Sequence, residues 1–183
     1  GDRLIEARVS TGDNDILLGT RNGKSIRFSE EQIRASGRKT MGVKGITLSS
    51  EDDKLVGMLL IKRDGTVLVA TEQGFGKRTE ISQYRAQKRG GKGVLTMKTT
   101  DKVGKMVTIK EVVEKDDLMI ITNQGVLIRL PVSQIRSIGR ATQGVKLIKL
   151  GEGTLVSSIT RIMTEEEKKE DGEGANSEQP AEG

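Results

Sequence analysis

The sequence predicts an all-β fold of the propeller type, in which similar four-stranded blades follow one another along the chain. Three stretches superimpose at a spacing of 51 residues without a gap, each contains short apolar runs, and each has a glycine just after its first run. A period near 50 residues built from short strands is typical of propeller blades, which bury their faces against their neighbours. Eight positions carry one residue type in all three copies: Thr20/Thr71/Thr122, Gly23/Gly74/Gly125, Arg27/Arg78/Arg129, Gln32/Gln83/Gln134, Arg34/Arg85/Arg136, Arg38/Arg89/Arg140, Gly42/Gly93/Gly144 and Val43/Val94/Val145.

Each repeat contains four candidate strands. The first is a continuous apolar run, as expected for a strand that is buried on both faces. The glycine that follows it provides the positive φ of a tight hairpin into the second strand. The expected strands are 16–20, 67–71 and 118–122 (first), 24–28, 75–81 and 126–130 (second), 43–48, 94–99 and 145–150 (third), and 55–61, 106–112 and 155–162 (fourth).

The repeats divide the chain into blades at 11–62, 63–113 and 114–163. Residues 4–9 lie 51 positions before the fourth strand at 55 and are expected to form an isolated fourth strand, so residues 1–10 are interpreted as the end of a preceding blade. Three blades are fewer than the four to eight of a closed propeller. We therefore expect an open arc that is a fragment of a longer protein.

The composition excludes several kinds of site and divides the chain by charge. There is no Cys and no His, which excludes disulfides, Cys/His zinc sites and catalytic triads that need either residue. No apolar run is long enough to span a membrane, and no signal peptide is evident. Residues 1–163 hold 29 basic and 18 acidic residues, a net charge of +11, which favours a polyanionic partner.

Residues 164–183 have the opposite charge, with eight acidic residues and two lysines giving −6. Their lack of apolar residues predicts a disordered acidic tail. Two roles stay open for it, a solubilising end and an internal competitor for the basic surface.

The connections between second and third strands, at 31–41, 82–92 and 134–143, are the candidate binding segments. They are too long for hairpins and rich in Arg, Lys, Gly, Ser and Gln. In the middle copy, residues 87–93 place three cations among three glycines, a pattern suited to a phosphate cradle but also to a flexible solvated loop. Cations at matching places in the other copies favour the first interpretation. The candidate residues are Gln87, Lys88, Arg89, Gly90, Gly91, Lys92, Gly93, Arg34, Arg38, Lys39, Arg85, Arg136 and Arg140.

Two further groups of residues have open roles. Arg27, Arg78 and Arg129 lie on second strands, where they either face a ligand or have a structural role, in which they cap blade edges or pair with carboxylates such as Glu30, Glu80 or Glu111. Tyr84 is the single tyrosine, and Ile33 and Ile135 occupy its place in the other copies, so we expect it to be a packing residue. No catalytic residue and no metal site is predicted.

These residues resemble the C-terminal domain of the bacterial DNA gyrase A protein. Residues 87–93 are similar to that family's Gln-Arg-Arg-Gly-Gly-Arg/Lys-Gly box, with Lys88 in place of the first Arg. The resemblance also covers Gln32 to Arg38, Ser137 to Val145, the hairpins and the acidic tail. It implies three blades of a six-bladed β-pinwheel that wraps duplex DNA. The family's principal box lies in the first blade, so this one resembles an additional box.

The resemblance also implies the setting of the domain. It would belong to an ATP-hydrolysing type IIA topoisomerase that introduces negative supercoils, with two copies each of gyrase A and gyrase B, acting on the chromosome in the bacterial cytoplasm. ATP and Mg would be used by the whole enzyme, and no cofactor is expected for this chain. The alternatives are the homologous protein of topoisomerase IV and a propeller-like scaffold that binds an acidic protein surface. Carboxylates such as Glu51 to Asp53 lie in expected turns and give little support to an enzyme site.

Overall fold

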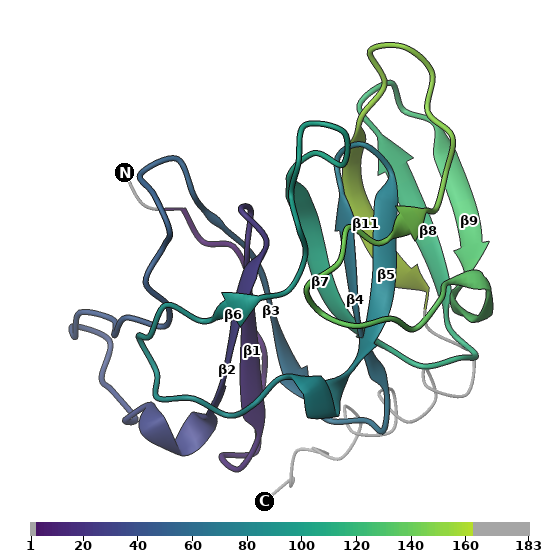
Figure 1. Ribbon diagram of the computed structural model, residues 1–183. Coiled ribbons are helices and arrows are strands. Elements are labelled where there is room, and N and C mark those ends of the chain that lie inside the picture. The colour runs from purple at the N-terminus through teal and green to yellow at the C-terminus, as the bar shows by residue number, and fades with distance from the viewer. Residues whose placement is uncertain (1–2, 163–183) are drawn as a thin grey trace, which may run out of the picture.

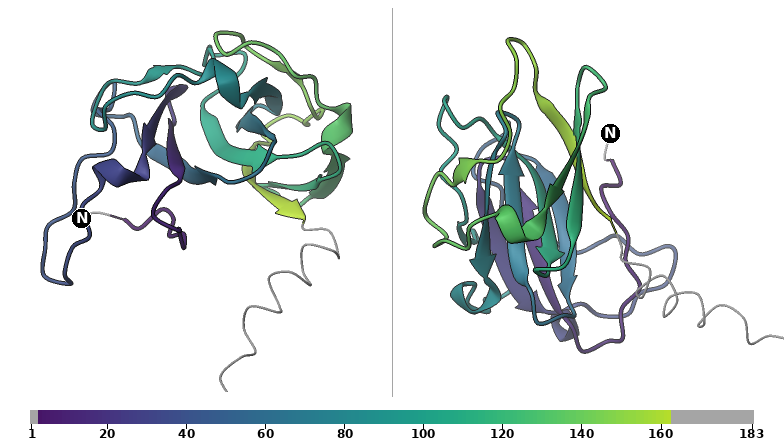
Figure 2. Two further views of the ribbon diagram at one scale, coloured as in Figure 1. Left: turned by 90° about the horizontal axis from the view of Figure 1, so that it is seen from below. Right: turned by 90° about the vertical axis from the view of Figure 1, so that its right-hand side faces the viewer.

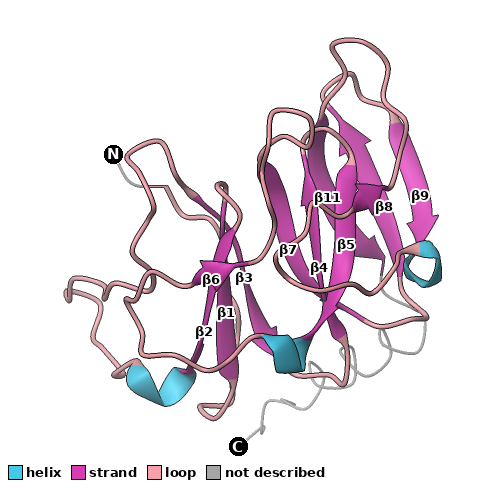
Figure 3. Cartoon of the chain, in the orientation of Figure 1, coloured by secondary structure: helices cyan, strands magenta, loops and turns pink. Residues whose placement is uncertain are grey.

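The computed structural model describes residues 3–162 as three antiparallel sheets placed side by side in a curved row (Figures 1 and 2). The predicted all-β class is confirmed, since the helices of this part are three single 3-10 turns (Figure 3). None of them is long and apolar enough to cross a membrane. The elements are β1 (Asp15–Thr20), β2 (Lys24–Ser29), η1 (Glu30–Gln32), β3 (Leu55–Ile61), β4 (Thr66–Thr71), β5 (Phe75–Glu80), η2 (Ile81–Gln83), β6 (Val94–Leu95), β7 (Met106–Val112), β8 (Asp117–Thr122), β9 (Leu127–Pro131), η3 (Val132–Gln134), β10 (Val145–Lys146) and β11 (Val156–Ile162).

Each sheet is built around the hairpin that the sequence predicts. β1 pairs with β2, β4 with β5, and β8 with β9. The turn glycines Gly23, Gly74 and Gly125 have φ of +83°, +76° and +78°, in the region that L side chains rarely adopt. The fourth strands β3, β7 and β11 pair with the first strand of their own repeat.

The third strands do not join the sheet of their own repeat, which differs from the expectation. The sheet orders are β3-β1-β2-β6, β10-β5-β4-β7 and β11-β8-β9. β6 belongs to the second repeat but pairs with β2 of the first, and β10 belongs to the third but pairs with β5 of the second. Figure 1 shows the teal segment after η2 crossing to the first sheet and returning through β6. The second and third repeats therefore each complete the outer edge of the sheet before them.

Two expected strands are absent from the described residues. Residues 43–48 are irregular because residues 3–162 contain no second strand ahead of β1 with which they could pair. Residues 4–9 are also irregular, because side chains and not a backbone ladder hold them near β3: the Met58 N–H donates to a Glu6 carboxylate oxygen at 3.1 Å. Within residues 3–162 the third sheet has three strands, in the order β11-β8-β9, and no strand of this part pairs with the outer edge of β9.

The apolar core lies between the sheets. Leu17 and Leu59 of the first sheet pack with Val67, Val69 and Ile109 of the second. A larger cluster then joins the second sheet to the third. The continuous apolar run of β4 is buried on both faces as predicted, and β7 contacts both β3 and β11 along the inside of the row. The acidic tail predicted at 164–183 lies outside the described residues.

Candidate nucleic-acid interface

Two equivalent loops follow the outer, convex edge of the row. We call residues 85–93 the first rim loop and residues 136–144 the second rim loop; they are 51 positions apart. The first rim loop begins beside β2, where the Gln87 N–H donates to the Arg27 carbonyl at 2.8 Å, and it ends at β6. The second is placed in the same way against β5 and ends at β10. Figure 2 (left) shows both on the convex side, in teal and green.

The recurrent glutamines of the first and second repeats, Gln32 and Gln83, hold the rim loop of the next repeat. Gln32 accepts from the Arg89 N–H at 2.8 Å through Oε1 and donates from Nε2 to the Gln87 carbonyl at 3.3 Å. Gln83 accepts from the Arg140 N–H at 3.3 Å in the same manner. The sequence analysis assigned no role to these glutamines, although their recurrence in the 51-residue register was the available signal.

The glycines of residues 87–93 are explained by contact with the first sheet. Gly93 has φ of +68°, and a Cβ there would lie 2.3 Å from the Ser25 carbonyl oxygen. Gly90 has φ of +81°, and its N–H donates to the Gly45 carbonyl at 2.7 Å. Direct approach of this backbone to a phosphate stays a prediction, since close packing already requires glycine at Gly93 and the positive φ favours it at Gly90.

Several of the predicted cations are exposed and uncommitted. The side chains of Lys88, Lys92, Arg85 and Arg136 are exposed and make no hydrogen bond or ion pair with another residue of 3–162. The same holds for the cations of the irregular segment ahead of the first rim loop, namely Arg34, Arg38 and Lys39. Positive charge without internal carboxylate partners is therefore carried by the rim loops and, separately, by this irregular segment, in which Arg34 lies at the pocket on the free face of the first sheet.

Two other predicted cations are partly used within the fold. The Arg89 guanidinium donates to the Lys44 carbonyl at 2.6 Å and to the Gln32 carbonyl at 3.2 Å. The Arg140 guanidinium donates to the Leu95 carbonyl at 3.0 Å. Both arginines thus anchor a rim loop while keeping their charge at the edge.

The arginines on the second strands have a structural role, although not with the carboxylates we expected. Arg27 pairs with Asp15 at 2.5 Å and Arg129 with Asp117. Arg78 pairs with Glu114 and also donates to the Ile135 carbonyl at 2.7 Å. Glu30, Glu80 and Glu111 were wrong as partners: Asp15 and Asp117 lie on the first strand of the same repeat, and Glu114 lies in the turn between β7 and β8.

Tyr84 is 1% exposed within the core between the first two sheets, and burial raises its pKa to about 12. It is therefore a packing residue, as predicted. Among residues 3–162 no group of three or more acidic residues is placed to hold a metal ion.

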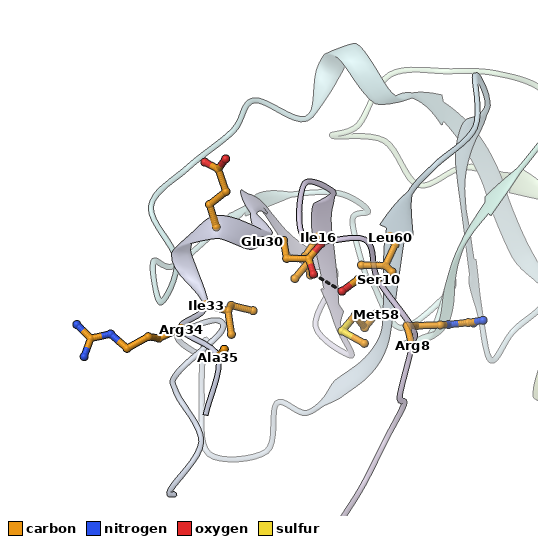
Figure 4. A pocket seen from close by; sticks show the side chains of 11 residues that line it. Arg8, Ser10, Ile16, Glu30, Ile33, Arg34, Ala35, Met58 and Leu60 are labelled. Atoms are coloured by element: carbon orange, nitrogen blue, oxygen red, sulfur yellow. Dashed lines mark hydrogen bonds between the residues drawn. The ribbon is translucent and has the colours of Figure 1, made fainter. Parts of the chain in front are cut away.

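A pocket of about 440 Å³ lies on the face of the first sheet that points away from the second. Figure 4 shows Ile16, Ile33, Met58 and Leu60 around it, with Arg34 extending away. In the second repeat the places of Ile33 and Met58 are taken by Tyr84 and Ile109, which are buried at 1% and 2% exposure. The pocket is therefore a sheet face of the kind that the next sheets cover, and its apolar lining gives no indication of a polyanion site.

Comparisons with known proteins agree with this architecture. A family model described as the DNA gyrase C-terminal domain, beta-propeller, matches residues 14–62, 65–112 and 116–162. The DNA gyrase A protein of Staphylococcus epidermidis is 47% identical over 168 residues, covering 91% of this chain and 19% of that protein. The DNA gyrase A protein of Staphylococcus aureus is 46% identical over 174 residues, covering 93% of this chain and 20% of its own length. The chain thus spans about a fifth of the length of these relatives.

Two solved structures share the fold. A DNA gyrase A C-terminal domain has a TM-score of 0.76 at 25% identity, covering 82% of this chain and 51% of that one. A C-terminal domain of DNA topoisomerase IV has a TM-score of 0.82 at 24% identity, covering 92% and 54%.

Proposed function

This chain belongs to the DNA gyrase C-terminal domain family, and from that premise we propose that its outer edge binds duplex DNA and bends it along the row of sheets. The observation that carries the proposal is the series of exposed, uncommitted cations along the convex edge, above all Lys88, Lys92, Arg85 and Arg136. Of the rim-loop cations, Arg85 and Arg89 recur as Arg136 and Arg140, because the two rim loops are placed by the same exchange of strands, whereas Lys88 and Lys92 belong to the first rim loop alone.

The arrangement suits a sequence-independent interaction. Bending a short DNA duplex costs roughly 1 to 6 kcal/mol by elastic estimates, and repeated phosphate contacts must offset this cost. Lys and Arg side chains that contact phosphates fix the position of a duplex but carry little sequence information. We therefore expect affinity to depend on duplex length and salt, and only weakly on base sequence.

The first experiment measures salt dependence with a duplex of about 40 base pairs, roughly four helical turns. Affinity should fall steeply between about 50 and 200 mM salt, and Lys88→Ala should reduce the slope by about 1 because one phosphate contact is lost. Lys62→Ala is the matched control, because Lys62 follows β3 at the opposite edge of the sheet. Equal affinity at both salt concentrations, or an equal loss of slope in the control, would refute the proposal.

The second experiment separates wrapping from coating. A plasmid relaxed by topoisomerase I in the presence of this chain should retain supercoils after deproteinisation, and the family resemblance predicts the positive sign. An unchanged linking number would limit the function to charge-driven binding. A partner that stays attached after nuclease treatment would instead favour the scaffold that binds an acidic protein surface.

We further propose the role of the domain in the whole protein. It would present a bent segment to the strand-passage machinery of a type IIA topoisomerase in the bacterial cytoplasm, together with the rest of the gyrase A polypeptide and with gyrase B. The high identity to gyrase A proteins favours gyrase over topoisomerase IV. ATP use and cleavage chemistry are assigned to other parts of that assembly.

A further inference from the structure

Lys77 is a buried lysine in the middle of β5, beneath the second rim loop. It is 0% exposed, whereas Ile26 and Ile128 occupy its register position in the first and third repeats. Lysine is almost never fully buried unless its ammonium has partners. A charged group at an otherwise apolar position therefore requires a specific explanation.

All the partners of this ammonium belong to the second rim loop. Nζ donates to the Gly139 carbonyl at 2.6 Å, to the Arg140 carbonyl, and to the Thr142 hydroxyl at 3.1 Å. The neighbouring Thr79 hydroxyl donates to the Ile138 carbonyl at 2.8 Å. These bonds turn the negative ends of several loop carbonyl dipoles toward the interior, away from the outer surface.

No carboxylate of residues 3–162 balances this charge. The elements packed against β5 here include β4, which places Val69 opposite Lys77, β10 with its exposed Lys146, and the second rim loop with Arg136 and Arg140. Burial, and then the nearby Arg140, lower the pKa of Lys77 to about 8.

The arginines of the second strands differ in this respect, since each has a carboxylate partner. A buried cation without one is suited to an anion that arrives from outside.

We propose that Lys77 is a positioning residue for DNA binding, which holds the second rim loop by its carbonyls and supplies positive charge to duplex phosphate from beneath it. The proposal rests on the DNA-binding function proposed above. It also explains an imbalance between the loops, since the first rim loop carries four cations and the second carries two. A phosphate near the loop stabilises the charged ammonium, so DNA binding raises the pKa of Lys77 and takes up protons near pH 8.

The test compares wild type with Lys77→Met for a duplex of about 40 base pairs at pH 7 and pH 9. Wild-type affinity should fall about threefold to tenfold between these pH values, as expected for loss of one nearby charge. Lys77→Met should bind the duplex at both pH values with the lower affinity that wild type has at pH 9. Lys110→Met is the matched control: Lys110 is also partly buried with a lowered pKa, but it lies on β7 at the opposite edge of the sheet. It should retain the wild-type affinity and pH profile.

Three outcomes decide the proposal. If Lys77→Met folds and keeps the wild-type affinity and pH dependence, the proposal is overturned. The α-amino group titrates in the same pH range, but it is present in all variants and so contributes equally to each. If Lys77→Met does not fold, the pKa of Lys77 is measured in wild type from its Nζ resonance by NMR. A Lys77 pKa that does not rise when duplex is added overturns the proposal. Absence of binding by wild type at pH 7 would instead refute the DNA-binding function itself.

Discussion

The two rim loops occupy equivalent places but are held by different chemistry. In the first, the neutral hydroxyl of Thr47 donates to the Gly90 carbonyl at 2.7 Å, and Ile26 packs beneath Gly91. In the second, Lys98 replaces Thr47 in the register, and the buried ammonium of Lys77 provides the side-chain donor. The first rim loop thus carries all of its positive charge on the loop itself, whereas the second carries Arg136 and Arg140 on the loop and the charge of Lys77 beneath it. Only the second arrangement is sensitive to pH.

The largest expected effect concerns what the two loops share, their close packing on the preceding sheet. Gly93→Ala should lower the free energy of unfolding by about 3 kcal/mol, because the new Cβ meets the Ser25 carbonyl and the positive φ is strained. Gly42→Ala is the control, since a Cβ at Gly42 meets nothing within 4 Å. Denaturant unfolding gives the free energy of unfolding of both variants. If both lose the same amount, the packing of Gly93 on the first sheet does not stabilise the fold.

The second effect separates the loops by their titration. The folded-state pKa of Lys77 lies below the unfolded value of 10.5, so the folded state binds fewer protons between pH 8 and 10.5. The penalty of burying the charge is full below pH 8 and disappears as pH rises. Unfolding free energy should therefore increase by about 2 kcal/mol between about pH 7.5 and 9.5.

Lys77→Met should lack this increase in an unfolding series across the same pH values. A wild-type stability that falls over this range would contradict the assigned direction. Stability and DNA affinity are thus expected to change in opposite directions, which distinguishes the charge from a purely structural role.

The third effect measures the exposed charge of each loop. Replacing Lys88 and Lys92 together by Ala should reduce the slope of log affinity against log salt by about 2, whereas Arg136→Ala should reduce it by about 1. Fluorescence anisotropy with a labelled duplex gives both slopes. A larger effect from the second rim loop would reverse the assignment of the dominant contacts to residues 87–93.

The smallest expected effect concerns the Thr47 hydroxyl, the neutral hydrogen-bond donor that holds the first rim loop. Thr47→Val removes the hydrogen bond to Gly90 and should cost about 1 kcal/mol of local stability. Hydrogen exchange should become faster at amides of the first rim loop and stay unchanged in the second. Faster exchange in both loops would show that the two are coupled.

The hairpins and the fourth strands were predictable because their signals are local. A run such as Val67 to Thr71 followed by Gly74 predicts a strand and a turn without knowledge of the rest of the chain. The third strands were not predictable in the same way, since β6 and β10 obtain their partner from another repeat. Residues 43–48 have the same pattern but no such partner among the described residues, and they form no strand.

The candidate interface was predictable as a set of cations but not in its internal contacts. Residue type alone could not separate exposed Lys88 from Arg89, whose guanidinium donates to Lys44 and Gln32. Lys77 was missed because a lysine on a strand normally indicates a solvated face. Its signal was the register, where the other two copies have isoleucine.

The exchange of outer strands also bears on the order in which the chain folds during synthesis. The first sheet cannot gain β6 until residue 95 has been made, which is after the whole β4 and β5 hairpin has been synthesised. In the same way, the second sheet is complete only after β10 has been synthesised and has paired with β5. A ribosome that pauses at the end of a sequence repeat would therefore leave one sheet with an open edge, available to a wrong strand. The folding unit extends beyond one repeat, because the first and second sheets are each completed by a strand of the following repeat.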